Sequence, residues 1–125
     1  MGDKVEIINQ NYLEYFPTQT YSGVFTSGSI HYAENAGYPL ELVIGRIQGY
    51  VSSGGFLFQE YIHRSESDND PNRHFLDKAK MASFFDNSQW TIIKHRKRQY
   101  TEGPNPRNNQ EHIIVWGSML AKRNN

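Results

Sequence analysis

Residues 41–63 of the 125-residue chain read ELVIGRIQGYVSSGGFLFQEYIH, and this stretch decides the predicted fold. From Val43 to Val51 every second residue is apolar or glycine, which is the alternation of a β-strand. Residues 52–55 have the composition of a hairpin turn, and residues 56–63 alternate again. We therefore expect two antiparallel strands, over residues 41–51 and 56–63, joined by a tight turn.

Outside this stretch, four more segments are typical of strands and one is typical of a helix. The strands are expected at residues 5–8, 20–33, 90–100 and 111–120. Asp70-Pro71 predicts a helix start, because Asp caps a helix and Pro fits its first position. The sequence thus predicts a mainly β fold: an antiparallel barrel or half-barrel of about six strands, with one helix near residues 71–86 between two hairpins. Residues 1–125 are expected to form a single domain.

The composition excludes several classes of function. The chain has no cysteine, which rules out disulfides, thiolate metal sites and cysteine nucleophiles. Its apolar runs are too short for a signal peptide or a membrane span, so we expect a cytoplasmic protein with no membrane partner. The five histidines lack the close spacing of metal ligands, and no cofactor motif is present, so neither a metal nor a cofactor is expected.

The zero net charge of the chain hides an uneven distribution. Residues 1–71 carry three Lys or Arg against nine Asp or Glu, whereas residues 72–125 carry ten against four. The two halves neutralise each other if distant strands interleave in one sheet. The alternative is a surface for nucleic acid or for an acidic partner.

Aromatic residues supply the lead hypothesis for function. The eight Tyr, seven Phe and two Trp fall mostly in expected strands, which is typical of an aromatic-lined pocket for a small, largely apolar ligand. The predicted ligand-binding residues are Tyr50, Phe58, Glu60, Trp90, His112 and Trp116. A His–Glu pair at such a pocket would allow acid–base chemistry, so it stays open whether the protein is an enzyme. The competing interpretation is a solid aromatic core.

The basic segment from Lys94 to Arg98 supplies the alternative. It carries charge on both faces of its expected strand, so this strand must be exposed or lie at an edge. As a nucleic-acid site it would use Lys94, Arg96 and Arg98 for phosphates and Tyr100 for stacking. A third interpretation is a non-catalytic interaction or inhibitor protein, or a homo-oligomer, joined through an exposed strand edge. The small-molecule hypothesis leads, because zero net charge argues against a dedicated nucleic-acid binder.

Overall fold

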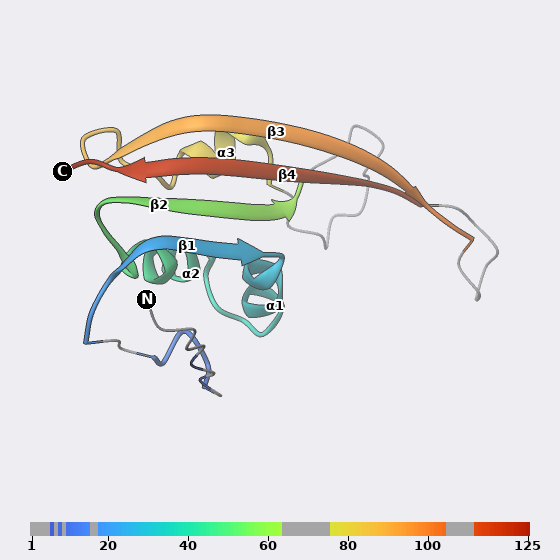
Figure 1. Ribbon diagram of the computed structural model, residues 1–125. Coiled ribbons are helices and arrows are strands. Elements are labelled where there is room, and N and C mark those ends of the chain that lie inside the picture. Colours follow the sequence, from blue (N-terminus) through green and yellow to red (C-terminus); the bar gives the residue numbers. More distant parts are fainter. Residues whose placement is uncertain (1–5, 7, 9, 16–17, 64–75, 105–111) are drawn as a thin grey trace.

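A computed structural model describes residues 6, 8, 10–15, 18–63, 76–104 and 112–125, which form four strands and three helices (Figure 1). In chain order the elements are β1 (Tyr21–Ser27), α1 (Ser29–Asn35), α2 (Leu40–Gln48), β2 (Val51–Ile62), α3 (Lys78–Ala82), β3 (Trp90–Glu102) and β4 (His112–Arg123). In this part of the chain, no helix has the length and apolar character that crossing a membrane requires.

The four strands form one open, mixed sheet in the order β1-β2-β4-β3. β1 runs parallel to β2, and β4 runs antiparallel to both β2 and β3. Within the described residues β1 and β3 are the two edges, so the sheet does not close on itself. The prediction of an antiparallel barrel or half-barrel of six strands was therefore wrong. The reason is that α1 and α2 carry the chain back across the sheet, and such a crossover makes β1 and β2 parallel.

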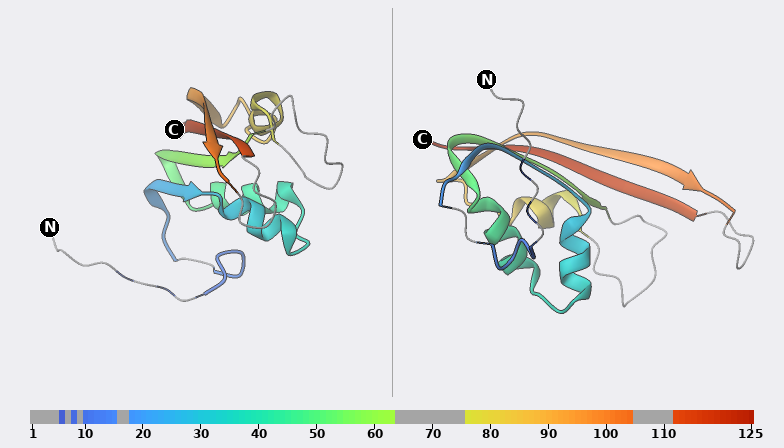
Figure 2. Two further views of the ribbon diagram at one scale, coloured as in Figure 1. Left: turned by 90° about the vertical axis from the view of Figure 1, so that its right-hand side faces the viewer. Right: turned by 60° about the horizontal axis from the view of Figure 1, so that its bottom comes forward.

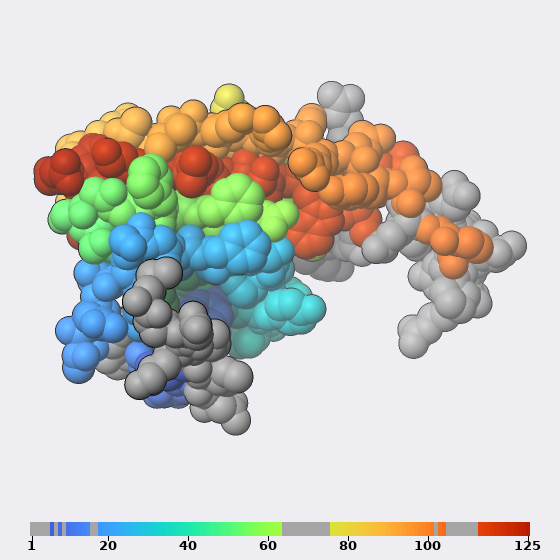
Figure 3. All heavy atoms as spheres, viewed as in Figure 1, coloured from blue at the N-terminus to red at the C-terminus, as the bar shows by residue number. Residues whose placement is uncertain are grey.

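All three helices lie on one side of the sheet (Figure 2, right-hand view). In β2 the buried residues alternate, with Leu57, Gln59 and Tyr61 fully covered. On this side the helices add apolar residues to a continuous core, including Ile30, Val43, Ile44, Ile47 and Met81. The opposite side of the sheet is its open face: side chains of β2, β3 and β4 reach the surface there (Figure 3).

Most of the predicted strand at residues 41–51 is helix α2. Val43, Ile44 and Ile47 are buried, at the spacing of one helix face, whereas a Cβ on Gly45 would meet nothing within 4 Å. Val43 and Ile47 fit both the strand pattern and the helix pattern. Ile44 is therefore the residue that distinguishes the two patterns, because it would lie on the opposite face of a strand. The preceding expected strand, residues 20–33, is likewise extended only over β1 before α1 begins.

The glycine pair at residues 54–55 lies inside β2 and does not form the predicted turn. The pairing of β1 with β2 jumps here, because Tyr21 pairs with Val51 but Gly23 pairs with Phe56. Gly54 has a φ of +77°, and a Cβ on Gly55 would lie 2.9 Å from the Ser52 carbonyl oxygen. Glycine is needed at this pair because the strand kinks there and its backbone packs closely.

The predicted helix at residues 71–86 is much shorter in the described part of the chain. α3 spans Lys78–Ala82, and the expected start at Asp70-Pro71 lies outside the described residues. Asp77 is the residue that caps this helix, because its side chain accepts a hydrogen bond of 2.7 Å from the Lys80 backbone N–H. The predicted strand at residues 5–8 is not found: Glu6 and Ile8 are not in a strand, and residues 5 and 7 lie outside the described part.

The predicted strands at residues 90–100 and 111–120 are confirmed as the antiparallel pair β3 and β4. β3 is an edge strand, as its charges on both faces indicated. β4 is central in the sheet but is covered on one side only. Trp116, Ser118 and Leu120 remain half-buried on the open face, because the helices pack on the other side.

Tyr61 and Gly117 are closely packed on the helix-covered face. They are register partners across β2 and β4. A Cβ built on Gly117 would collide with the Tyr61 ring and would lie 2.7 Å from the hydroxyl oxygen. Only glycine leaves room at position 117 for the buried phenol ring.

We expect Gly117→Ala to lower the free energy of unfolding by about 1–3 kcal/mol, because the added methyl group overpacks this contact. Urea denaturation measures the change. Gly45→Ala is the matched control: its Cβ meets open space in a helix, so it should raise stability by up to about 1 kcal/mol. Equal effects of the two substitutions would contradict the steric role of Gly117.

Candidate functional site

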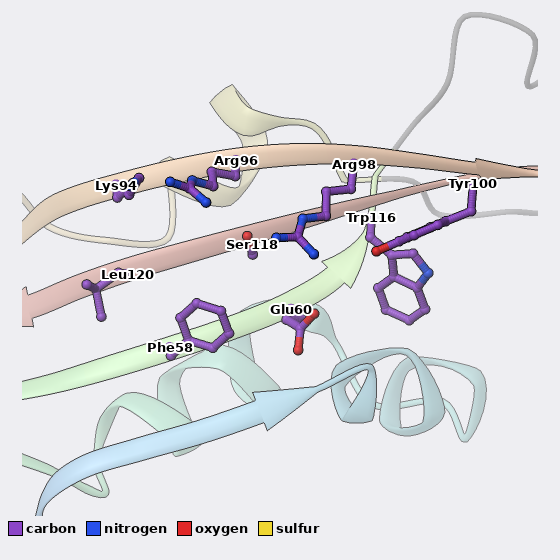
Figure 4. A pocket seen from close by; sticks show the side chains of 9 residues that line it. All are labelled: Phe58, Glu60, Lys94, Arg96, Arg98, Tyr100, Trp116, Ser118 and Leu120. Carbon is purple, nitrogen blue, oxygen red and sulfur yellow. The ribbon is translucent and has the colours of Figure 1, made fainter.

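The open face of the sheet holds a pocket of about 300 Å³ (Figure 4). Its lining residues come from three strands: Phe58 and Glu60 from β2, Lys94, Arg96, Arg98 and Tyr100 from β3, and Trp116, Ser118 and Leu120 from β4. Successive residues of a strand point to opposite faces, so alternate residues of each strand share this surface. The pocket is therefore a direct product of strand alternation and register.

The central row of the pocket joins Glu60, Ser118 and Arg96. Glu60 pairs with Ser118 across β2 and β4, and Ser118 pairs with Arg96 across β4 and β3. Neighbouring strands lie about 4.8 Å apart, which places the Cα atoms of Glu60 and Arg96 about 10 Å apart on either side of Ser118. The small serine side chain forms the floor between an acidic and a basic residue.

The rows on either side of Ser118 are built from large side chains. In one row Leu120 lies between Phe58 and Lys94, and in the other Trp116 lies beside Arg98. Leu120 and Trp116 each lie about 7 Å along β4 from Ser118. The hollow therefore has apolar walls and a charged rim.

Trp116 closes the end of the pocket near the carboxyl ends of the parallel strands. Its indole ring would come within 3.6 Å of a Cβ on Gly28, the residue that follows β1. Gly28 has a left-handed φ of +70°, and its N–H donates a 3.0 Å hydrogen bond to the Glu60 carbonyl oxygen. In open α/β sheets, ligands bind outside the carboxyl ends of the strands.

The apolar wall continues beyond the pocket onto β1. Phe25 stacks on Phe58 with the ring centroids 5.4 Å apart and the planes inclined by 5°. Phe25 is still 64% exposed, although it belongs to a parallel strand pair, a type of pair that is usually covered on both faces. The open face thus presents aromatic surface as well as charge.

The structure brings two sets of predicted residues together. Phe58, Glu60 and Trp116 come from the small-ligand hypothesis, and Lys94, Arg96, Arg98 and Tyr100 come from the nucleic-acid alternative; all seven line the same pocket. The sequence did not indicate that Ser118 and Leu120 belong with them, because both the odd and the even positions of residues 113–120 are mainly apolar, which does not distinguish an open face from a covered one. The available signal was the alternation of Ser118 and Leu120 with the buried Met119.

The other three predicted ligand-binding residues lie elsewhere. Tyr50 precedes β2, and its hydroxyl donates hydrogen bonds to the carbonyl oxygens of Tyr12 and Tyr15. Trp90 is buried on the helix-covered face, where it meets Phe85 edge to face at 5.3 Å. His112 begins β4 opposite Glu102, and its side chain lies outside what the structure describes.

A second group of polar rings lies under the helices, away from the pocket. The buried Tyr61 hydroxyl shares a hydrogen bond with Nε2 of His95, and the His63 ring is 6.0 Å from that of Tyr61. Burial raises the pKa of Tyr61, with a smaller contribution from Asp77. Burial, followed by the charge of Lys78, lowers the pKa of His95. Both groups are therefore neutral near pH 7. Among the described residues, no three His, Cys, Asp or Glu side chains gather as metal ligands would.

His31 ties α1 to the end of β2. Its Nε2 accepts a 2.7 Å hydrogen bond from the Ile62 N–H, and burial lowers its pKa. That hydrogen bond uses the lone pair that a proton would occupy. This hydrogen bond therefore requires neutral His31.

Comparison with known proteins identifies the fold and not a family. No family model matches the sequence, and no curated protein matches it. Among solved structures the chain is similar to TehB from Haemophilus influenzae, at a TM-score of 0.63 and 9% identity over 93% of this chain and 40% of that one. It is also similar to a 1,6-didemethyltoxoflavin-N1-methyltransferase from Burkholderia thailandensis, solved with 1,6-didemethyltoxoflavin and S-adenosylhomocysteine bound. That match has a TM-score of 0.63 and 13% identity over 94% of this chain and 50% of that one.

A third similar structure comes from work on the conversion of a disulfide bond into a thioacetal group during echinomycin biosynthesis. Its TM-score is 0.61, at 12% identity over 92% of this chain and 54% of that one. The chain thus spans about half the length of these structures. At such low identities the shared property is the fold: an open sheet of Rossmann type, of the kind found in a methyltransferase.

We expect stability to depend on pH through His31. Its pKa in the folded state lies below the unfolded value of ~6.5, so the unfolded state binds the proton more readily. The free energy of unfolding should be level above about pH 7 and fall as the pH drops below ~6.5 towards the folded pKa. Urea denaturation from pH 5 to 8 measures this. His31→Gln should reduce the slope and leave the part that comes from His95, whose pKa is lowered as well. An unchanged slope would contradict the role of the neutral imidazole.

Proposed function

We propose that the open-face pocket binds a small molecule, and that the chain is the part of a small-molecule methyltransferase that holds the methyl acceptor. One observation carries this proposal. A pocket with apolar walls and a charged rim lies across three strands, and a methyltransferase with a bound small molecule is among the structures that share the fold.

The position and the size of the pocket support a ligand site. It reaches the carboxyl ends of β1 and β2 through Trp116, the end of the sheet where ligands bind in folds of this type. Its volume of about 300 Å³ is at the lower limit of small-molecule sites. A compact, one- or two-ring molecule is the size that fits.

The chemistry of the lining changes the predicted ligand. A largely apolar ligand was expected, but Lys94, Arg96 and Arg98 make one side strongly basic. The acid–base role considered for a His–Glu pair has no support, since none of the described lining residues is a histidine. The proposed role is therefore to bind and orient a molecule.

A cofactor such as the S-adenosylhomocysteine of the Burkholderia enzyme does not fit the described residues. In Rossmann-type sheets a glycine-rich turn after a strand lets the backbone approach a cofactor closely. Here the turn after β1 has one glycine, Gly28, and the Trp116 indole already packs against it. The proposal for this chain is accordingly confined to the acceptor.

Ser118→Phe should block the pocket, because a phenyl ring on the floor fills the space between Phe58 and Trp116. A thermal-shift screen of small aromatic molecules identifies binders of the unmodified protein. We expect the variant to bind them at least tenfold more weakly, which corresponds to about 1.4 kcal/mol. Its melting temperature should change little, since Ser118 lies on the open face.

Ser53→Phe is the matched control for this variant, because Ser53 is exposed and outside the pocket. It should leave binding unchanged. Finding no binder, or binders that are insensitive to Ser118→Phe, would disprove a small-molecule site at this place.

A second candidate function is single-stranded nucleic-acid binding, favoured by the three cations that share the open face with Tyr100 and Trp116. It predicts that a fluorescent oligonucleotide binds with an affinity that falls steeply with salt. The triple variant Lys94/Arg96/Arg98→Ala should abolish that binding, whereas Lys97→Ala, on the opposite face of β3, should reduce it only slightly. No oligonucleotide binding at low salt would eliminate this candidate.

A further inference from the structure

The pocket has two chemically different sides, and they face each other across Ser118. Glu60 is the acid among its lining residues, on the β2 side, whereas the β3 side carries three cations. The register fixes this opposition, because Glu60 and Arg96 are both paired with Ser118. A bound molecule that spans the floor therefore meets an acceptor at one end and donors at the other.

The basic side is arranged to hold an anion. Lys94, Arg96 and Arg98 follow one another at every second position of β3, about 7 Å apart, so two of them can approach one ligand group. Within the described part of the chain, no salt bridge or side-chain hydrogen bond is formed by these three residues. In Figure 4, Arg98 reaches from β3 over β4, whereas the side chain of Arg96 lies along β3, and both line the pocket. A guanidinium group binds a carboxylate through two parallel hydrogen bonds, which favours a planar anion.

The walls select a flat body between the two polar ends. Phe58 and Leu120 stand on one side of the Ser118 row and Trp116 on the other. Phe58 is already stacked on Phe25, which limits its freedom to move. The hollow is one residue row wide, and the walls that flank it are mainly aromatic, so a ring system fits it better than a branched chain does.

We propose that the ligand is a flat aromatic acid that also carries a hydrogen-bond donor. The acid group binds Arg96 and Arg98, the ring lies over Ser118 between Phe58 and Trp116, and an N–H or O–H group of the ligand donates to the Glu60 carboxylate. This inference rests on the proposed function, since it assigns the chemistry of the small molecule that the same pocket holds.

The acid group is tested with 2-naphthoate and its uncharged analogue 2-naphthamide. Fluorescence titration and calorimetry of the full chain measure both dissociation constants. We expect 2-naphthoate to bind at least tenfold more tightly, because its carboxylate accepts charge-assisted hydrogen bonds that the neutral amide cannot make with equal strength. Arg96→Gln and Arg98→Gln should each weaken 2-naphthoate about tenfold and leave 2-naphthamide unchanged.

Lys97→Gln is the matched control for these variants. It removes the same charge from the same strand, but Lys97 pairs with Gly117 and points to the other face of the sheet. It should leave the affinity for 2-naphthoate within about twofold, because exposed charges at a distance are screened. An effect as large as that of Arg96→Gln would show a general attraction to a basic strand and would overturn the proposed anion site.

The donor group is tested by comparing 6-amino-2-naphthoate with 2-naphthoate. The amino compound should bind more tightly to the unmodified protein. Glu60→Met should remove this preference and at the same time strengthen 2-naphthoate, because it removes a negative charge that repels the ligand. A preference that survives in Glu60→Met would overturn the assignment of Glu60.

The outcomes separate this inference from the proposed function. If 2-naphthamide and 2-naphthoate bind equally and both are blocked by Ser118→Phe, the pocket is a small-molecule site but its ligand is not an acid. If Ser118→Phe blocks the binding of neither compound, the pocket is not their binding site, and both the proposed function and this inference are overturned. Displacement of 2-naphthoate by a short oligonucleotide at a lower concentration than by 6-amino-2-naphthoate would overturn the inference in favour of nucleic acid.

Discussion

The contact between Tyr61 and Gly117 is the constraint on which the open face depends. It sets the register of β2 against β4 on the helix-covered side, where a side chain at position 117 has no room. A slip of one residue would turn every side chain of a strand to the other face. The alignment of Glu60 with Ser118, one residue away in both strands, therefore follows from a contact on the opposite side of the sheet. The geometry of the pocket therefore depends on core packing on the opposite face of the sheet.

The sequence predicted the C-terminal hairpin well and the stretch at residues 41–51 poorly. The reason is how clearly the pattern of each segment distinguishes a strand from a helix. β3 and β4 are long segments rich in β-branched and aromatic residues, and the charges of β3 left only an exposed or edge position. In the stretch from Val43 to Val51, by contrast, the apolar residues at 43, 47 and 51 fit both periods, although only the first two of them lie in α2. Pro39 immediately before the helix and Glu41 in its first turn are ordinary start signals that favoured the helix.

The two sides of the pocket could be predicted from the sequence, but their meeting on one surface could not. Alternation predicted that Lys94, Arg96 and Arg98 share a face, and that Phe58 and Glu60 share one. It could not show that these two faces are the same surface, because β4 inserts between β2 and β3 and only the register reveals that neighbour. The residues of the small-ligand hypothesis and those of the nucleic-acid alternative thus line two sides of one pocket. Trp90 was assigned to the site as an aromatic residue of an expected strand, but it is buried on the other side of the sheet.

β4 is under two separate kinds of constraint along its length. On one side Gly117, Met119 and Ala121 are buried in the core, where a change of size costs stability. On the other side Trp116, Ser118 and Leu120 line the open-face pocket, and Trp116 also packs against Gly28. Odd and even positions of one strand can therefore diverge independently. Related chains could acquire new ligand preferences by exchanging even-numbered residues, while the odd-numbered residues keep the sheet in register.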